Sequence, residues 1–133
     1  MKGNLKELEQ LLQTMDSFRE KNSEKFKLLV DTGVRVKRLV SKEDLNGKKL
    51  DETKFEVQIE DDAFQSYRQL NLNAVQNEDD ILKLVHFSET MSQYFDEVMV
   101  NSPQELLKNN RLAFMAKLNT LFSEIADFEA FQV

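Results

Sequence analysis

The amino-acid sequence predicts an all-α fold, a single bundle of about five helices. Two observations lead to this prediction. Apolar residues recur at three- and four-residue steps along most of the chain, which is the spacing of one helix face. Only three glycines and one proline occur among the 133 residues, so few positions interrupt a helix. We expect one domain over residues 1–133, because this length is typical of a single domain.

The first two helices are predicted in the N-terminal third. We expect the first from about Asn4 to Glu20, and Asn22 or Ser23 can cap the second. The first apolar face consists of Leu5, Leu8, Leu11, Leu12, Met15 and Phe18. The second consists of Phe26, Leu29, Val30, Gly33, Val36 and Val40. A glycine inside a helix costs roughly 1 kcal/mol relative to alanine. We therefore expect Gly33 to allow close contact with a neighbouring helix.

The segment 41–53 is polar and contains Asn46-Gly47, which is a turn signal. Beyond it, three apolar residues alternate with polar ones: Phe55, Val57 and Ile59. This alternation is compatible with a short strand, but no partner strand is evident elsewhere. An extended linker that packs its apolar side chains on helices is the preferred interpretation.

Three further helices are predicted after this linker. The third is expected from about Asp61 to Gln76, and the fourth from Asn77 to about Val98. Before the last helix, Ser102 suits the N-cap, Pro103 the first helical position and Glu105 the third position of a capping box. This final helix is expected to continue toward Phe128.

Catalytic constellations are scarce in this sequence. The absence of cysteine excludes disulfides and Cys-based zinc sites. His86 is the single histidine, and its apolar neighbours favour a structural or surface role over a catalytic one. The acidic runs 60–62 and 78–80 favour helix starts over metal sites, because carboxylates stabilise helix N-termini. The sequence therefore predicts a binding domain without catalytic residues, and no membrane-spanning segment.

The charge is distributed unevenly along the chain. The net charge of −6 divides into 13 basic and 10 acidic residues in 1–54, against 5 and 14 in 55–133. Arg35, Arg38 and Lys42 are spaced so that one helix face can present them together. Positive charge at a helix C-terminus explains part of this pattern. The functional alternative is a phosphate-binding patch on an otherwise acidic protein.

The C-terminal third resembles a known family. The segments 94–101 (YFDEVMVN), 108–115 (KNNRLAFM) and 121–128 (LFSEIADF) are similar, in order and spacing, to the C-terminal region of the bacterial glycyl-tRNA synthetase β subunit. Val36-Lys37-Arg38-Leu39 is similar to an earlier segment of that family. Lys108 stands where the family usually has arginine, and Val36 where it usually has an aromatic residue.

The resemblance implies the C-terminal DALR-type anticodon-binding domain of a longer subunit. By this resemblance the domain binds the anticodon arm of glycine tRNA and needs no cofactor itself. The whole cytoplasmic enzyme would use ATP and magnesium to join glycine to its tRNA. Its other parts would be the rest of the β subunit and the α subunit, in an α2β2 assembly.

We expect phosphate anchoring by a basic set and base recognition near the last helix. The candidate RNA-binding residues are Arg35, Lys37, Arg38, Lys42, Lys48, Lys49, Lys108, Asn109 and Arg111. For Arg111, an architectural ion pair with Asp96 across two helices is favoured over RNA contact. Asp96, Phe95 and Asn110 are also expected to be architectural. The alternative function is a helical protein–protein docking module with no direct RNA contact, because residues 55–133 are acidic and would repel RNA.

Overall fold

Five α-helices account for most of the computed structural model, which describes residues 5–72 and 74–132. They are α1 (Leu5–Lys21), α2 (Ser23–Val40), α3 (Gln58–Leu70), α4 (Glu78–Glu97) and α5 (Glu105–Ile125). Two short 3-10 helices are η1 (Glu52–Lys54) and η2 (Phe128–Phe131). No strand occurs in the described ranges, so the all-α prediction is confirmed. Asn4, the expected start of the first helix, lies outside the described residues.

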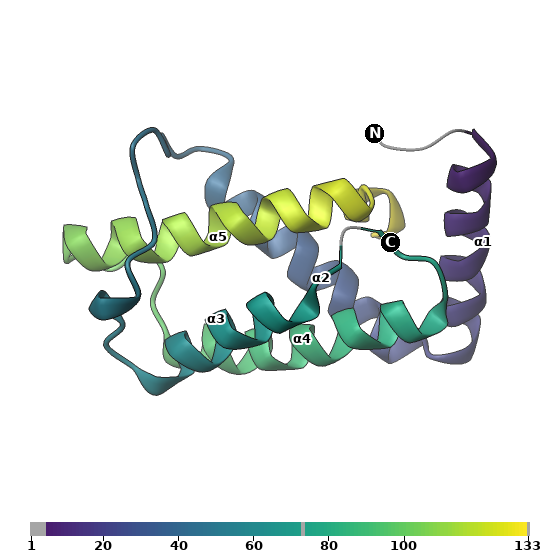
Figure 1. Ribbon diagram of the computed structural model, residues 1–133, viewed down its shortest axis with the longest axis horizontal. Coiled ribbons are helices and arrows are strands. Elements are labelled where there is room, and N and C mark those ends of the chain that lie inside the picture. The colour runs from purple at the N-terminus through teal and green to yellow at the C-terminus, as the bar shows by residue number, and fades with distance from the viewer. Residues whose placement is uncertain (1–4, 73, 133) are drawn as a thin grey trace.

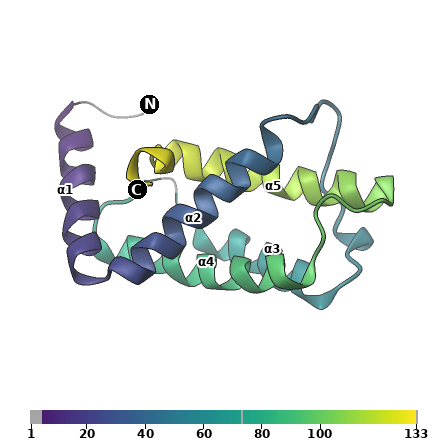
Figure 2. The same cartoon turned by 180° about the vertical axis from the view of Figure 1, so that it is seen from behind.

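The helices form a bundle in which α2 is central on one side. α3 packs along α4, and α2 packs against both α4 and α5 (Figure 2). α1 stands across one end, beside α2 and α4 (Figure 1). None of the helices in the described part combines the length and apolar character needed to cross a membrane.

Most of the apolar faces that the helical spacing predicts form the core, but Leu5 and Leu12 of the first face are 71% and 42% exposed. The largest fully buried side chains of the core are Tyr94, Phe18, Phe114, Phe122, Met15, Leu29, Ile81, Leu84, Met91, Leu112, Met115 and Leu118. Residues 110–115 are all buried, and six consecutive residues span more than one helical turn. This part of α5 is therefore enclosed on all sides rather than on one face.

Residues 41–57, which we call the strap, provide part of this enclosure. The strap leaves the end of α2, passes over α5 and reaches the start of α3 (Figure 1). Phe55 and Val57 are partly buried against the core, whereas Ile59 belongs to α3. An extended linker is thus confirmed for residues 55–57, and the strand alternative is wrong.

The boundaries of α3 differ from the prediction. The helix begins at Gln58 rather than Asp61, because the Glu60 carboxylate accepts the backbone N–H groups of Glu56 and Val57 and caps an earlier first turn. It ends at Leu70 rather than Gln76, where Asn71 adopts a left-handed conformation with φ 47°. The predicted length was wrong because these two local signals outweigh the apolar spacing.

The predicted helix starts are correct for α4 and two residues early for α5. The Asn77 side chain accepts the backbone N–H of Asp80 at 3.0 Å, which confirms it as a cap. At α5, Ser102 Oγ accepts the N–H of Gln104 at 3.1 Å, which forms a turn before the helix. Asn22 precedes α2 but makes no capping side-chain hydrogen bond.

Gly33 makes the close contact that its position predicts, but with a 3-10 turn instead of a helix. A Cβ atom at Gly33 would lie 3.0 Å from Cδ2 of Phe128, the first residue of η2. Phe128 is buried and packs edge-on against Phe122, with ring centroids 5.7 Å apart. Gly33 therefore allows the C-terminal segment to fold back onto α2.

Candidate nucleic-acid interface

The C-terminal half of α2 carries three of the predicted basic residues, and all three are exposed. Arg35 points toward α4, where its guanidinium lies 4.0 Å from the ring centroid of Phe95. Lys37 and Arg38 instead turn toward the C-terminal segment. The expected single cationic face is therefore divided between two sides of α2.

Lys37 and Arg38 have partners in the C-terminal segment. Lys37 Nζ lies 3.2 Å from a carboxylate oxygen of Glu129, and Arg38 Nη2 donates to Oε1 of Gln132 at 3.3 Å. Because all four side chains are exposed, water screens these contacts and each adds little stability. Neither contact therefore holds its cation strongly.

The strap carries three more predicted residues, Lys42, Lys48 and Lys49. Lys42 and Lys49 are exposed, and Lys48 is half-buried. The turn between them depends on Asp44, which accepts the N–H of Asn46, and on Gly47 at φ 74°. The predicted turn is therefore confirmed.

The segment 108–111 uses most of its polar side chains to hold the strap and α3. Lys108 Nζ lies 4.0 Å from Glu43, near the start of the strap. Asn110 is buried and pairs with the backbone of Asp51: its Oδ1 accepts the Asp51 N–H at 2.7 Å, and its Nδ2 donates to the Asp51 carbonyl at 3.1 Å. Asn109 is half-buried. This segment therefore contacts the strap at Glu43 and Asp51, on either side of Lys48 and Lys49.

Arg111 is buried and forms an ion pair with Glu60 instead of Asp96. Its Nε donates to Oε1 of Glu60 at 3.0 Å, and its Nη1 donates to the carbonyl of Met99 at 2.9 Å. Asp96 is exposed on the last turn of α4. The predicted Arg111–Asp96 pair is therefore wrong. Arg111 does have a structural role, but its partner is Glu60.

The environment of Glu60 keeps it ionised. Burial raises the pKa of this carboxyl, but hydrogen bonds from Arg111 and from the amides of Glu56 and Val57 outweigh burial and leave the pKa below its ordinary value. Burial also raises the pKa of the Tyr94 hydroxyl, and the negative charge of Glu60 adds to this effect. Glu60 was not predicted as the partner because an acidic residue at a helix start is normally solvated. The signal that could have indicated this role is a glutamate at the third helical position, where its carboxylate can cap the helix start.

Catalytic geometry is not evident around the single histidine. His86 is exposed, and its Nδ1 lies 3.0 Å from Oε1 of Glu89. In the described part of the chain, no three histidine, aspartate or glutamate side chains are grouped to hold a metal ion.

Comparison with known proteins finds distant similarity to glycine–tRNA ligase β subunits over part of the chain. The subunit of Leuconostoc mesenteroides is 32% identical over 107 residues, covering 78% of this chain and 16% of the relative. That of Lactobacillus helveticus is 30% identical over 108 residues, covering 80% and 15%. That of Erwinia tasmaniensis is 36% identical over 55 residues, covering 41% and 8%.

The chain thus spans between 8% and 16% of the length of these three relatives. No family model matches the chain. No solved structure matches it either.

Proposed function

We propose that this chain belongs to the β-subunit family of bacterial glycine–tRNA ligase and forms its C-terminal, DALR-type anticodon-binding domain. The relatives named glycine–tRNA ligase β subunit, similar over up to 80% of the chain, support the family. The exposed basic residues of α2 and the strap support the binding role, since phosphate contacts dominate nucleic-acid affinity.

The observation that carries the proposal is the local concentration of cations on an acidic protein. Between residues 34 and 49 there are six basic and two acidic residues, although the whole chain has a net charge of −6. The proposed phosphate anchors are Arg35, Lys37, Arg38, Lys42, Lys48 and Lys49. A basic segment of this restricted length suits one RNA arm, and the acidic remainder of the chain disfavours indiscriminate binding.

The remaining predicted residues differ in how they can act. Lys108 and Asn109 are partly accessible and stay candidates for RNA contact. Arg111 is buried with Glu60, so its proposed contribution is to hold the start of α3. The domain itself supplies binding and positioning, not chemistry.

The similarity to glycine–tRNA ligase β subunits also supports a proposal for the activity of the whole enzyme. It would join glycine to its tRNA in the cytoplasm, using ATP and magnesium bound outside this domain. Its partners would be the rest of the β subunit and the α subunit, in an α2β2 assembly.

The proposal is tested with an RNA hairpin that reproduces the anticodon arm of a bacterial glycine tRNA. Binding of the labelled hairpin is measured by fluorescence anisotropy at several salt concentrations. The triple variant Lys42→Ala, Lys48→Ala, Lys49→Ala should bind more weakly. Its salt slope should fall by about 0.7–0.9 for each phosphate that the variant no longer neutralises.

The matched control removes three exposed lysines from other elements: Lys25→Ala, Lys83→Ala and Lys117→Ala. It changes the net charge equally, so any difference between the triples reports the location of the cations. Equal effects of the two triples, or no effect of removing all six proposed anchors, would refute the anchoring proposal. The protein–protein docking alternative, which the acidic remainder of the chain favours, would then replace it.

A further inference from the structure

The Arg35–Phe95 contact is the best-defined feature of the side of α2 that faces α4. The Arg35 guanidinium lies 4.0 Å from the Phe95 ring centroid, well within the range of a cation–π contact. The ring itself is supported from below. Phe95 packs edge-on against Tyr94 at 5.6 Å, and Tyr94 packs against Phe114 at 5.7 Å.

The supported Phe95 ring fixes the orientation of the otherwise flexible Arg35 side chain. Tyr94 and Phe114 are each 1% exposed, so the base of the stack belongs to the core. Arg35 is exposed, and a guanidinium held over a ring on one side presents its other side to solvent. Flat guanidinium surfaces of this kind can stack on unpaired bases of RNA.

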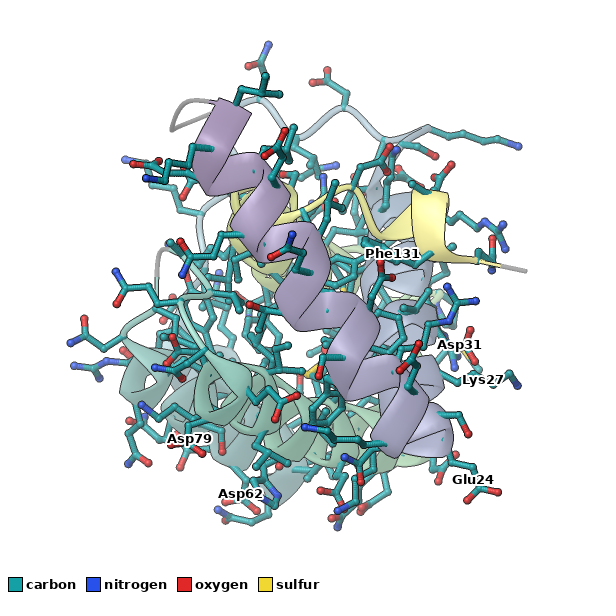
Figure 3. The ribbon with its side chains drawn as sticks, turned by 90° about the vertical axis from the view of Figure 1, so that its right-hand side faces the viewer. Glu24, Lys27, Asp31, Asp62, Asp79 and Phe131 are labelled. Atoms are coloured by element: carbon teal, nitrogen blue, oxygen red, sulfur yellow. The ribbon has the colours of Figure 1, made fainter. Side chains whose placement is uncertain are left out.

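The local charges make this site poor for phosphate and better for a neutral group. Asp96 and Glu97 follow Phe95 on the last turn of α4 and are exposed, and helix C-termini carry partial negative charge. Asp31 lies one turn before Arg35 on α2 and pairs with Lys27 at 3.7 Å; Figure 3 shows both on the outer edge of the molecule. Lys27 offsets the charge of Asp31, but Asp96, Glu97 and the C-terminus of α4 would repel a phosphate, whereas an uncharged nucleobase avoids that repulsion.

We propose that the outer surface of Arg35, backed by Phe95, binds one unpaired nucleobase by stacking. This inference rests on the proposed RNA-binding function and changes the expected role of Arg35 from phosphate anchor to base platform. Lys42 is exposed and lies in the strap, two residues beyond the end of α2. We expect it to hold a phosphate of the same RNA loop.

The test combines protein variants with abasic RNA. Each loop nucleotide of the anticodon-arm hairpin is replaced in turn by an abasic nucleotide, which keeps the phosphate and removes the base. At one loop position, the replacement should weaken binding to the unmodified protein about tenfold. The same replacement should have no further effect on the Arg35→Ala variant, because its base platform is already missing.

Arg35→Lys separates stacking from charge, since lysine keeps the cation but loses the planar group. We expect Arg35→Lys to bind about as weakly as Arg35→Ala, with the salt slope unchanged. Arg68→Lys is the matched control. Arg68 is exposed, and its guanidinium lies 5.8 Å from the ring centroid of Phe64, with both residues on α3. Circular dichroism verifies that each variant remains folded.

The two failures are distinguishable. If the hairpin binds through the strap lysines but Arg35→Lys behaves like the unmodified protein, the stacking inference is wrong and the proposed function stands. A salt slope that falls by about 1 in Arg35→Ala would identify a phosphate anchor and also overturn it. If the unmodified protein does not bind the hairpin, both proposals fail.

Discussion

Glu60 and Arg111 are 51 residues apart in the sequence and form a buried ion pair, with Nε of Arg111 donating to Oε1 of Glu60 at 3.0 Å. Their side chains are 2% and 6% exposed, so neither charge is solvated by water. Arg111 also binds the Met99 carbonyl. One guanidinium therefore joins the first turn of α3, the corner between α4 and α5, and α5 itself.

Removal of one partner from this pair should destabilise the fold strongly. Arg111→Met would leave the Glu60 carboxylate buried without its cation, at a cost of about 3–5 kcal/mol in the free energy of unfolding. Urea unfolding followed by circular dichroism measures this cost. Lys27→Met removes an exposed pair with Asp31 and serves as the control, with an expected loss of about 0–1 kcal/mol. Similar losses in both variants would contradict the buried pair.

The same carboxylate should make stability depend on pH. The pKa of Glu60 is lowered by folding, so its contribution to stability is complete above the ordinary pKa of 4.5 and is lost as the pH falls through the lower folded value. The difference in unfolding free energy between the unmodified protein and Glu60→Gln should therefore shrink on acidification.

In the Arg111→Met variant, the contribution of Glu60 to stability should depend on pH in the opposite direction. In Arg111→Met, burial acts on Glu60 without the cation and favours the protonated carboxyl. The contribution of Glu60 in that background should improve as the pH falls. An identical pH trend in the two backgrounds would show that Arg111 does not set the ionisation of Glu60.

Gly33→Ala should destabilise the protein although alanine favours helices by about 1 kcal/mol. The new Cβ would lie 3.0 Å from the Phe128 ring, and overpacking of this kind costs about 1–3 kcal/mol. Thermal unfolding should show a net loss that is smaller in the Phe128→Leu background, where the ring is absent. Stabilisation by Gly33→Ala would show instead that η2 shifts without cost.

Asn110→Ala should release the strap at Asp51. The substitution removes both hydrogen bonds to the Asp51 backbone, with an expected cost of about 1–3 kcal/mol. Amide hydrogen exchange should accelerate at Asp51, whose N–H bonds directly to Asn110. Asn119→Ala, on a later turn of the same helix, is the control. Unchanged protection of the Asp51 amide would mean that the strap is held by other contacts.

The positions of the helices could be predicted because apolar residues recur at helical spacing in each of them. Asn77 also marks the start of α4 correctly, since its cap is a local interaction. The start of α3 could not be found in this way. Phe55 and Val57 pack in extended backbone just before the helix, and Ile59 inside the helix continues their alternation with polar residues. The apolar pattern therefore does not change at Gln58, where α3 begins.

The contacts of the candidate site could not be predicted from the sequence, because they join residues that are far apart in the chain. The basic residues were identified by their charge, but tertiary packing decides that Arg35 turns to α4 and Arg38 to the C-terminal segment. The partner of Arg111 was likewise indeterminate, because exposed and buried acids look the same in a sequence. Only the fold distinguishes Glu60 from Asp96.

The strap has a consequence for the order in which the chain acquires structure during synthesis. Asp51 and Glu60 are made well before Asn110 and Arg111, so a nascent chain contains the strap and all of α3 without the groups that secure them. Until α5 has left the ribosome, the Glu60 carboxylate lacks its cation and is stabilised by water, which favours an exposed start of α3. We therefore expect the strap and the start of α3 to reach their native positions only after residues 108–111 have emerged.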